Sequence, residues 1–341
     1  MNTLLNTLCN GPQAGVLIPI PQYPLYTATL AMLNATPVPY YLDEANSWGT
    51  NVPLIRAHIA DARRAGTDVR CIVVINPGNP TGASLSEADI EAVLELAADE
   101  RLVVMADEVY QTNVYRGRQF HSFKKVLRNL QARHGAEAEG DGDGDANKYS
   151  HIELVSLHST SKGMVGECGH RGGYFELVGF DPAVQAQIYK LVSITLCPPV
   201  IGQCLVELMV NPPEPGSESY DLYAREYAAI YDGLEARSQA LYDAFESMTG
   251  VSCQHPQGAM YAFPTIHLPA RAQEQAQSEG RKPDEYYCLR LLDATGICVV
   301  PGSGFHQAPG TWHFRTTFLP PGTDWVQRLR RFHEAFMAEF E

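Results

Sequence analysis

The hydrophobic and polar positions in the first half of the chain alternate between short apolar runs and helical stretches. Apolar runs fill residues 69–75, 102–105 and 152–157, and polar residues, glycine or proline follow each run at once. Short apolar runs bounded in this way are typical of strands buried in a parallel sheet. Because ligands bind at the carboxyl ends of such strands, we expect a functional site where these three runs end.

Residues 84–100, between the first two runs, have the pattern of an amphipathic helix. The segment Ser84-Leu-Ser-Glu87 fits a capping box at its start. Apolar residues then recur at helical spacing at Ile90, Val93, Leu94 and Ala97. A strand, a helix and a second strand in this order predict a βαβ unit and therefore an α/β domain.

A second helical pattern covers residues 219–248. Its apolar and aromatic residues lie near one face: Tyr223, Tyr227, Ile230, Leu234, Leu241 and Phe245. Just before it, residues 211–216 contain three prolines, which cannot continue a helix or a central strand. We therefore predict a domain boundary here, between a large domain of residues 1–210 and a small domain of residues 211–341.

The segment of residues 135–147 is irregular and acidic, with five carboxylates and no basic residue. An EF-hand loop would need glycine at Ala146 and glutamate at Ile152, so this is not a calcium site. We predict a disordered acidic insertion at the surface.

The composition is that of a soluble globular protein, with 45% apolar and 19% charged residues among 341. A net charge of −14 argues against a partner that is a nucleic acid or an anionic membrane. The eight cysteines form no Cys-x-x-Cys pair, so we expect buried free thiols and no metal site. The sequence has no membrane-length apolar run, and its first basic residue is Arg56, so we predict a cytoplasmic protein.

Candidate chemistry follows the predicted strands. The turn of residues 76–82, Asn-Pro-Gly-Asn-Pro-Thr-Gly, comes after the first strand, and Asp107 comes at the end of the second. Each has a simpler interpretation, the turn as an ordinary loop and Asp107 as a helix N-cap. After the third strand, Lys162 stands in a cluster of Ser, Thr and Gly, nine residues before Arg171. Hydroxyls, glycine amides and an arginine suit a phosphate, and a lysine amine is a nucleophile toward carbonyls.

Together, these motifs resemble those of the fold-type I pyridoxal-phosphate aminotransferases. The resemblance rests on Asn-Pro-x-Asn-Pro-Thr-Gly (76–82), Asp-x-x-Tyr (107–110), Ser-x-Ser-Lys (159–162) and Gly-x-Arg-x-Gly (169–173). Five further segments look like the eukaryotic alanine aminotransferase branch: residues 20–26, 158–163, 166–174, 301–305 and 311–316. The likeness runs from about Val16 to the C-terminus. It implies an aspartate aminotransferase-like fold, with a mostly parallel sheet flanked by helices in the cofactor-binding large domain and a smaller C-terminal α+β domain.

The resemblance also implies a role for each candidate residue. Lys162 would bind pyridoxal 5'-phosphate covalently and act as the catalytic base, and Asp107 would face the pyridine nitrogen. Tyr110 and Asn79 would bond the ring's phenolic oxygen, and Tyr23 would stack on the ring. The phosphate would be held by Ser159, Ser161 and Arg171. Arg315, whose simpler interpretation is a surface salt bridge, would bind the substrate α-carboxylate with its two-pronged guanidinium.

The function that these roles imply is transamination by a ping-pong mechanism, between L-alanine/pyruvate and 2-oxoglutarate/L-glutamate, in a homodimer. Two alternatives stay open, an aminotransferase using glutamate and glyoxylate and a truncated paralogue without catalysis. The second arises because residues 1–15 contain no Asp-Gly-Ala-like phosphate-binding turn. In this family that turn precedes the region corresponding to Val16, so we predict a chain shortened at its N-terminus.

Overall fold

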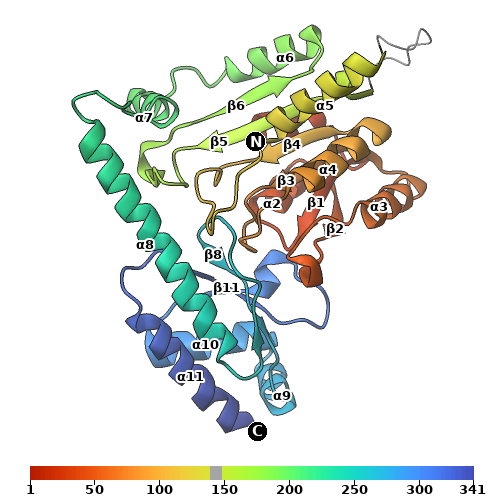
Figure 1. Ribbon diagram of the computed structural model, residues 1–341. Helices are drawn as coiled ribbons and strands as arrows, with labels where there is room; N and C mark the ends of the chain where they lie inside the picture. The colour runs from red at the N-terminus through yellow and green to blue at the C-terminus, as the bar shows by residue number, and fades with distance from the viewer. Residues whose placement is uncertain (139–147) are drawn as a thin grey trace.

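A mostly parallel sheet organises the N-terminal part of the molecule in the computed structural model, which describes residues 1–138 and 148–341 (Figure 1). Its strand order is β2-β1-β3-β4-β5-β6. The strands are β1 (Ala14–Ile20), β2 (Thr36–Tyr41), β3 (Asp68–Ile75), β4 (Val103–Asp107), β5 (Leu154–Ser159) and β6 (Gly173–Val178). Strands β1 to β5 run parallel, and β6 pairs antiparallel with β5. The predicted α/β class and the three predicted strands, β3, β4 and β5, are confirmed.

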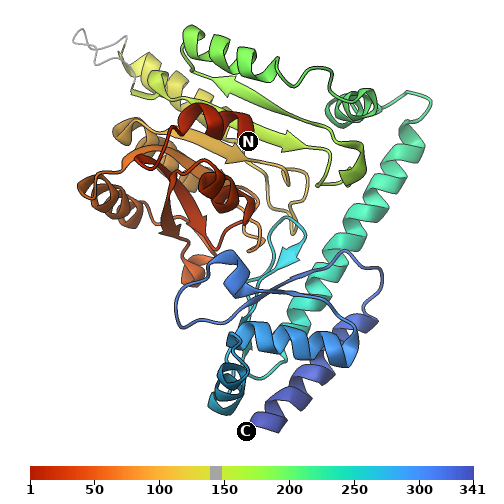
Figure 2. The same ribbon diagram turned by 180° about the vertical axis from the view of Figure 1, so that it is seen from behind.

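Helices cover both faces of this sheet, as the two opposite views show (Figures 1 and 2). One face packs on α1 (Asn2–Leu8), α2 (Leu25–Met32) and α6 (Pro182–Val192), and the other on α3 (Val52–Arg64), α4 (Glu87–Glu100) and α5 (Phe123–Ala138). In β4, Val103 and Met105 pack into the first core, while Val104 and Ala106 pack into the second. Because both faces are buried, these four successive positions are all apolar instead of alternating with polar ones.

Helix α4 begins later than the sequence pattern predicts. Its N-cap is Ser86, whose Oγ accepts a hydrogen bond from the Asp89 N–H at 3.2 Å, while the Asp89 carboxylate accepts one from the Ser86 N–H at 3.1 Å. The predicted capping box starting at Ser84 is therefore wrong by two residues. The reason is tertiary: the Ser84 N–H donates to Gln257 and the Leu85 N–H donates to Asn76, which holds these residues outside the helix.

The C-terminal part has its own core, built around a three-stranded sheet in the order β10-β11-β8 and the antiparallel pair β7–β9. The strands are β7 (Val251–Ser252), β8 (Tyr261–Ala262), β9 (Thr265–Ile266), β10 (Val300–Pro301) and β11 (Phe314–Thr317). The helices around them are α8 (Tyr220–Glu246), α9 (Ala270–Ser278), α10 (Pro283–Thr295) and α11 (Asp324–Phe340). This smaller α+β arrangement was expected.

The long helix α8 confirms the prediction for residues 219–248, but its apolar face is only half covered. Leu234, Leu241 and Phe245 are buried in the C-terminal core, whereas Ile230 is 51% exposed. Residues 211–219 separate α8 from α7 (Val200–Val210). The domain boundary at residue 211 stays a prediction.

Three smaller expectations have mixed outcomes. Residues 135–138 of the predicted acidic insertion form the end of α5, and residues 139–147 lie outside the described part of the chain. All eight cysteines are free. Burial was predicted for all of them, which is wrong for the exposed Cys168, Cys197, Cys204 and Cys298, because these lie outside the packed cores; Cys253 is only partly buried. Within the described ranges, no helix combines the length and the apolar character needed to cross a membrane.

Candidate active site

A cavity of about 780 Å³ opens at the carboxyl ends of β4 and β5, where the sheet meets the C-terminal part. All nine residues predicted for the site line it: Tyr23, Asn79, Asp107, Tyr110, Ser159, Ser161, Lys162, Arg171 and Arg315. They come from segments up to about three hundred residues apart, so the fold brings together what the motifs only suggested.

Asp107 is the last residue of β4 and faces the cavity. The hydroxyl of the buried Tyr26 donates a hydrogen bond to its Oδ2 at 2.8 Å. Burial raises the pKa of the Asp107 carboxyl, and this hydrogen bond and one from the Val109 N–H only partly oppose that effect. A cation placed opposite Asp107 would therefore favour its charged form. Sequence reasoning missed Tyr26, although it stands three residues after Tyr23 in the same motif.

Hydroxyl groups and backbone form a tight loop around Lys162. The Ser159 and Thr160 hydroxyls both donate to the Gly172 carbonyl oxygen at 3.1 Å. Ser159 Oγ accepts the Ser161 N–H at 3.1 Å, and Arg171 Nη1 donates to Ser161 Oγ at 3.4 Å. These bonds collect two hydroxyls and a guanidinium on one side of the cavity.

Glycine is required where this loop meets α7. A Cβ atom on Gly172 would lie 2.6 Å from the Gly202 carbonyl oxygen, and one on Gly202 would lie 2.5 Å from the Arg171 carbonyl oxygen. No side chain fits at either position without moving backbone. Arg171 is thus held close to the first turn of α7.

Asn79 lies at the tip of the turn after β3. Its Oδ1 accepts a hydrogen bond from Arg315 Nη1 at 3.0 Å, which joins the N-terminal part to the C-terminal part. The turn is closed by a bond from the Gly78 N–H to the Ala83 carbonyl at 2.8 Å. Gly82 has φ of +71°, and a Cβ atom there would lie 2.6 Å from the Tyr261 carbonyl oxygen. Only glycine combines this conformation with this close approach.

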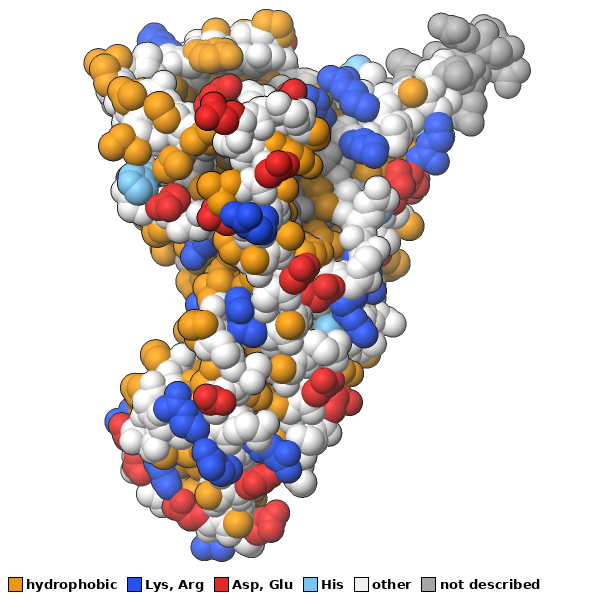
Figure 3. All heavy atoms as spheres, turned by 60° about the vertical axis from the view of Figure 1, so that its left-hand side comes forward, with side chains coloured by type: hydrophobic (Ala, Val, Ile, Leu, Met, Phe, Trp, Pro, Cys, Tyr) orange, Lys and Arg blue, Asp and Glu red, His pale blue; other side chains and the backbone are white. Residues whose placement is uncertain are grey.

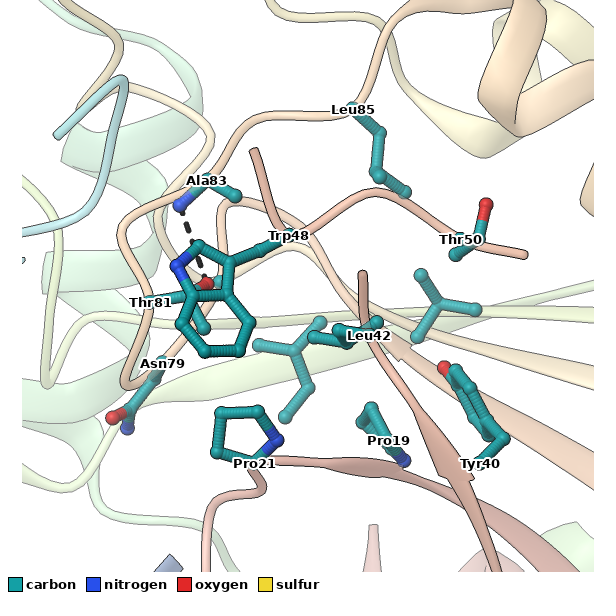
Figure 4. Close-up of a pocket in the computed structure, with 13 residues that line it drawn as sticks. Pro19, Pro21, Tyr40, Leu42, Trp48, Thr50, Asn79, Thr81, Ala83 and Leu85 are labelled. Atoms are coloured by element: carbon teal, nitrogen blue, oxygen red, sulfur yellow. Dashed lines mark hydrogen bonds between the residues drawn. The ribbon is translucent and has the colours of Figure 1, made fainter. Parts of the chain in front are cut away.

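An apolar cavity of about 20 Å³ lies beneath the same turn (Figure 4). Pro19, Pro21, Tyr40, Leu42 and Trp48 line it from β1, β2 and the following loop, and Asn79 stands at its edge. A void of this size leaves little room for the turn to shift. This close packing therefore helps to keep the turn, and with it Asn79, in place.

Arg315 lies on β11 between β10 and β8. Its guanidinium carbon is 4.5 Å from the centre of the Tyr261 ring and 5.0 Å from that of Phe305, so the cation rests against aromatic faces. The Tyr261 hydroxyl in turn shares a hydrogen bond with the Tyr110 hydroxyl at 2.9 Å. Sequence reasoning missed Tyr261, which stands in none of the recognised motifs, and gave no role to Phe305, which ends one of them.

Residues 1–328 match the family model for aminotransferase class I and II. The chain belongs to this aminotransferase family. Its solved structural neighbours agree in fold: an alanine aminotransferase from Pyrococcus furiosus has a TM-score of 0.77 at 26% identity, and the match covers 99% of this chain and 74% of that one. An aspartate aminotransferase from Rhizobium meliloti has a TM-score of 0.75 at 19% identity, covering 100% and 75%, which supports the fold alone.

Relatives of this aminotransferase chain include both active and inactive proteins by name. The mitochondrial alanine aminotransferase of Saccharomyces cerevisiae is 51% identical, and the match covers 100% of this chain and 56% of that protein. An inactive alanine aminotransferase of the same organism is 47% identical, with 99% and 64% covered. Alanine aminotransferase 2 of Xenopus laevis is 49% identical, with 99% and 61% covered. The chain spans about three fifths of the length of these relatives.

Proposed function

We propose that this chain binds pyridoxal 5'-phosphate and transfers the amino group between L-alanine/pyruvate and 2-oxoglutarate/L-glutamate. The observation that carries the proposal is the convergence of Lys162, Asp107 and Arg315 in one cavity. A nucleophilic amine, a buried carboxylate and a guanidinium fork are the groups that an amino acid and this cofactor require. The choice of alanine rests on the names of the relatives.

The residues of the cavity fit the cofactor. Asp107 is a carboxylate whose pKa burial raises, so a ring N–H⁺ opposite it would be favourable. Ser159, Ser161 and Arg171 gather on one side, where Ser161 and Arg171 would donate to a phosphate dianion and Ser159 would join them by turning its hydroxyl from the Gly172 carbonyl. When bound, the cofactor supplies an electron sink for the pair released at the substrate Cα.

Each residue of this chain then has a separate task. Asp107 would hold a proton on the ring nitrogen, and Tyr110 and Asn79 would donate hydrogen bonds to the phenolic oxygen. Arg315 binds the substrate α-carboxylate through two parallel hydrogen bonds. Lys162 Nζ would accept the proton released from the substrate Cα and hold it for return. Tyr23 covers the ring face and excludes water from it.

The test compares Lys162→Ala with a matched control, Lys190→Ala, which removes an exposed lysine of α6. The parent and the control, reconstituted with the cofactor, should show a visible absorption band that L-alanine removes, and should turn over L-alanine with 2-oxoglutarate. Lys162→Ala should show no turnover. Absence of a cofactor-dependent band in the parent, or normal turnover by Lys162→Ala, would refute the proposal.

The second candidate function is binding of the cofactor without catalysis. It is favoured by the inactive relative, which is nearly as similar as the active one. Equilibrium dialysis with the cofactor, followed by a panel of amino donors and oxo acceptors, separates the candidates. Binding without turnover of any pair supports the second function, and turnover of glutamate with glyoxylate but not of alanine supports the remaining alternative.

We also propose a homodimer, because α6, α7 and the start of α8 present a broad apolar surface (Figure 3). Its most exposed members are Tyr189, Ile194, Leu196, Val200 and Ile201, each 61–73% exposed. Soluble monomers rarely expose a continuous patch of this kind, and a second copy of the chain would cover it. Sedimentation should give a dimer for the parent and a monomer for Ile194→Asp combined with Val200→Asp; a monomeric parent would refute the proposal.

Two further proposals concern organisation and location. We place the domain boundary at residue 211, so proteolysis under native conditions should cut first in residues 211–219 and leave two resistant parts. We place the protein in the cytoplasm, although the yeast relative is named as mitochondrial. Cell fractionation that recovers the protein with mitochondria would overturn this location.

A further inference from the structure

The Tyr261 side chain contacts two residues of the candidate active site that have different proposed roles. The Tyr261 ring meets the Tyr110 ring edge to face, with centroids 5.8 Å apart and planes at 86°, and their hydroxyls share a hydrogen bond at 2.9 Å. The Arg315 guanidinium carbon lies 4.5 Å from the centre of the same Tyr261 ring. Tyr261 therefore joins a residue assigned to the cofactor with the residue assigned to the substrate carboxylate.

The contact between the two tyrosines is shielded from water. Tyr110 is 2% exposed and Tyr261 is 6% exposed. In such surroundings, a hydrogen bond is stronger than at the surface. Burial is the main cause that raises the pKa of the Tyr110 hydroxyl, and Asp107 raises it further, while Arg315 opposes them. Tyr110 thus keeps its proton at neutral pH and has it available to donate.

We propose that Tyr261 is a positioning residue with two separable parts. Its hydroxyl donates to Tyr110, so that the Tyr110 proton is directed at the cofactor's phenolic oxygen. Its ring supports Arg315 in the orientation that receives the substrate carboxylate. This inference rests on the proposed function, and the two parts have different consequences when removed.

The hydroxyl is removed alone by Tyr261→Phe, which leaves the ring under Arg315. Tyr110 then becomes a weaker donor, so the anionic phenolic oxygen is less stabilised. The pH midpoint of the holoenzyme's visible band should rise by about 0.3–1 pH unit, with KM for L-alanine changed by less than about twofold. The charged groups around this position, Asp107, Lys162 and Arg315, are unchanged in the variant.

The ring is removed as well by Tyr261→Leu. Arg315 then loses its aromatic support, so KM for L-alanine should rise about three- to thirtyfold in addition to the shift of the midpoint. The matched control is Tyr115→Phe, which removes a hydroxyl that donates to the Ala259 carbonyl at 2.8 Å in the same core. Tyr115 does not line the cavity, and its variant should match the parent in both measurements.

The inference is overturned if Tyr261→Phe has the midpoint of the parent, or if it raises KM as much as Tyr261→Leu does. Should Tyr261→Leu fail to fold, the pH midpoint of Tyr261→Phe compared with that of the parent still tests the inference. A separate measurement uses the protein without cofactor: calorimetry of pyruvate binding should show weaker binding for Tyr261→Leu than for Tyr261→Phe. A parent without a visible band refutes the proposed function, whereas equal pyruvate binding by the two variants refutes the inference.

Discussion

Replacing Arg315 by lysine should weaken the use of L-alanine while leaving cofactor binding unchanged. Lysine keeps the positive charge beside Tyr261 but loses the planar fork, and with it one of two hydrogen bonds to the carboxylate. It also loses the geometry that places Nη1 at 3.0 Å from Asn79 Oδ1. One charge-assisted hydrogen bond is worth about 1.5–3 kcal/mol, which predicts that kcat/KM for L-alanine falls roughly 10- to 150-fold.

The assay measures kcat/KM for L-alanine beside the absorption of the bound cofactor. The control is Arg328→Lys, at an exposed position on α11 whose guanidinium donates to the Thr295 backbone carbonyl, and it should retain parental activity. Arg171→Lys should instead weaken cofactor retention, because its guanidinium reaches Ser161 and the Cys168 carbonyl. If Arg315→Lys stays within about threefold of the parent, the carboxylate is bound elsewhere and the reasoning is wrong.

Three further predictions concern stability. Ser86→Ala should lower the free energy of unfolding by about 1 kcal/mol in urea titrations, whereas Ser219→Ala, an N-cap whose side chain makes no capping bond, should change it far less. Gly82→Ala should lower the free energy of unfolding by about 1–3 kcal/mol and lower Tm, because its Cβ would meet the Tyr261 carbonyl oxygen. Gly310→Ala, at φ of +82° with open space around it, should lower the free energy of unfolding less. Equal losses in the two variants would contradict the argument from close approach. Glu44→Gln tests pH dependence: burial alone would raise the pKa of Glu44, but hydrogen bonds from His313 and Thr265 outweigh burial and lower it. Glu44 therefore stabilises the fold above its unfolded pKa, and this stability is lost as the pH falls through the lowered value. The difference in urea midpoint between parent and variant should be full above the unfolded pKa and shrink as the pH falls through the lowered one.

The sequence predicts the parts of the site that local chemistry marks. Asp107 stands directly after a buried apolar run, and Lys162 stands in a dense cluster of small polar residues, so both positions follow from strand patterns and motifs. The chain's resemblance to a known family extended this to Arg315. All nine residues line one cavity, while their individual roles stay predictions.

The missed features depend on contacts between distant segments. Tyr261 belongs to a strand of two residues, too short to show any periodicity, and its partners Tyr110 and Arg315 are 151 and 54 positions away. Ser84 resembles an N-cap by spacing, but a bond to Gln257 overrides that preference. The periodic apolar residues of α8 indicate a helix, but they do not indicate which of its turns are buried against other elements.

The bond between Asn79 and Arg315 also determines which way the Asn79 amide faces. A guanidinium can only donate, so it requires the amide oxygen and repels the amide NH₂. With Oδ1 committed to Arg315, the two hydrogens on Nδ2 are left for an acceptor in the cavity. An aspartate at position 79 would bind Arg315 still more strongly but would have no hydrogen to give. If the proposed function is correct, only the neutral amide can accept from a cation on one side and donate to an anionic oxygen on the other.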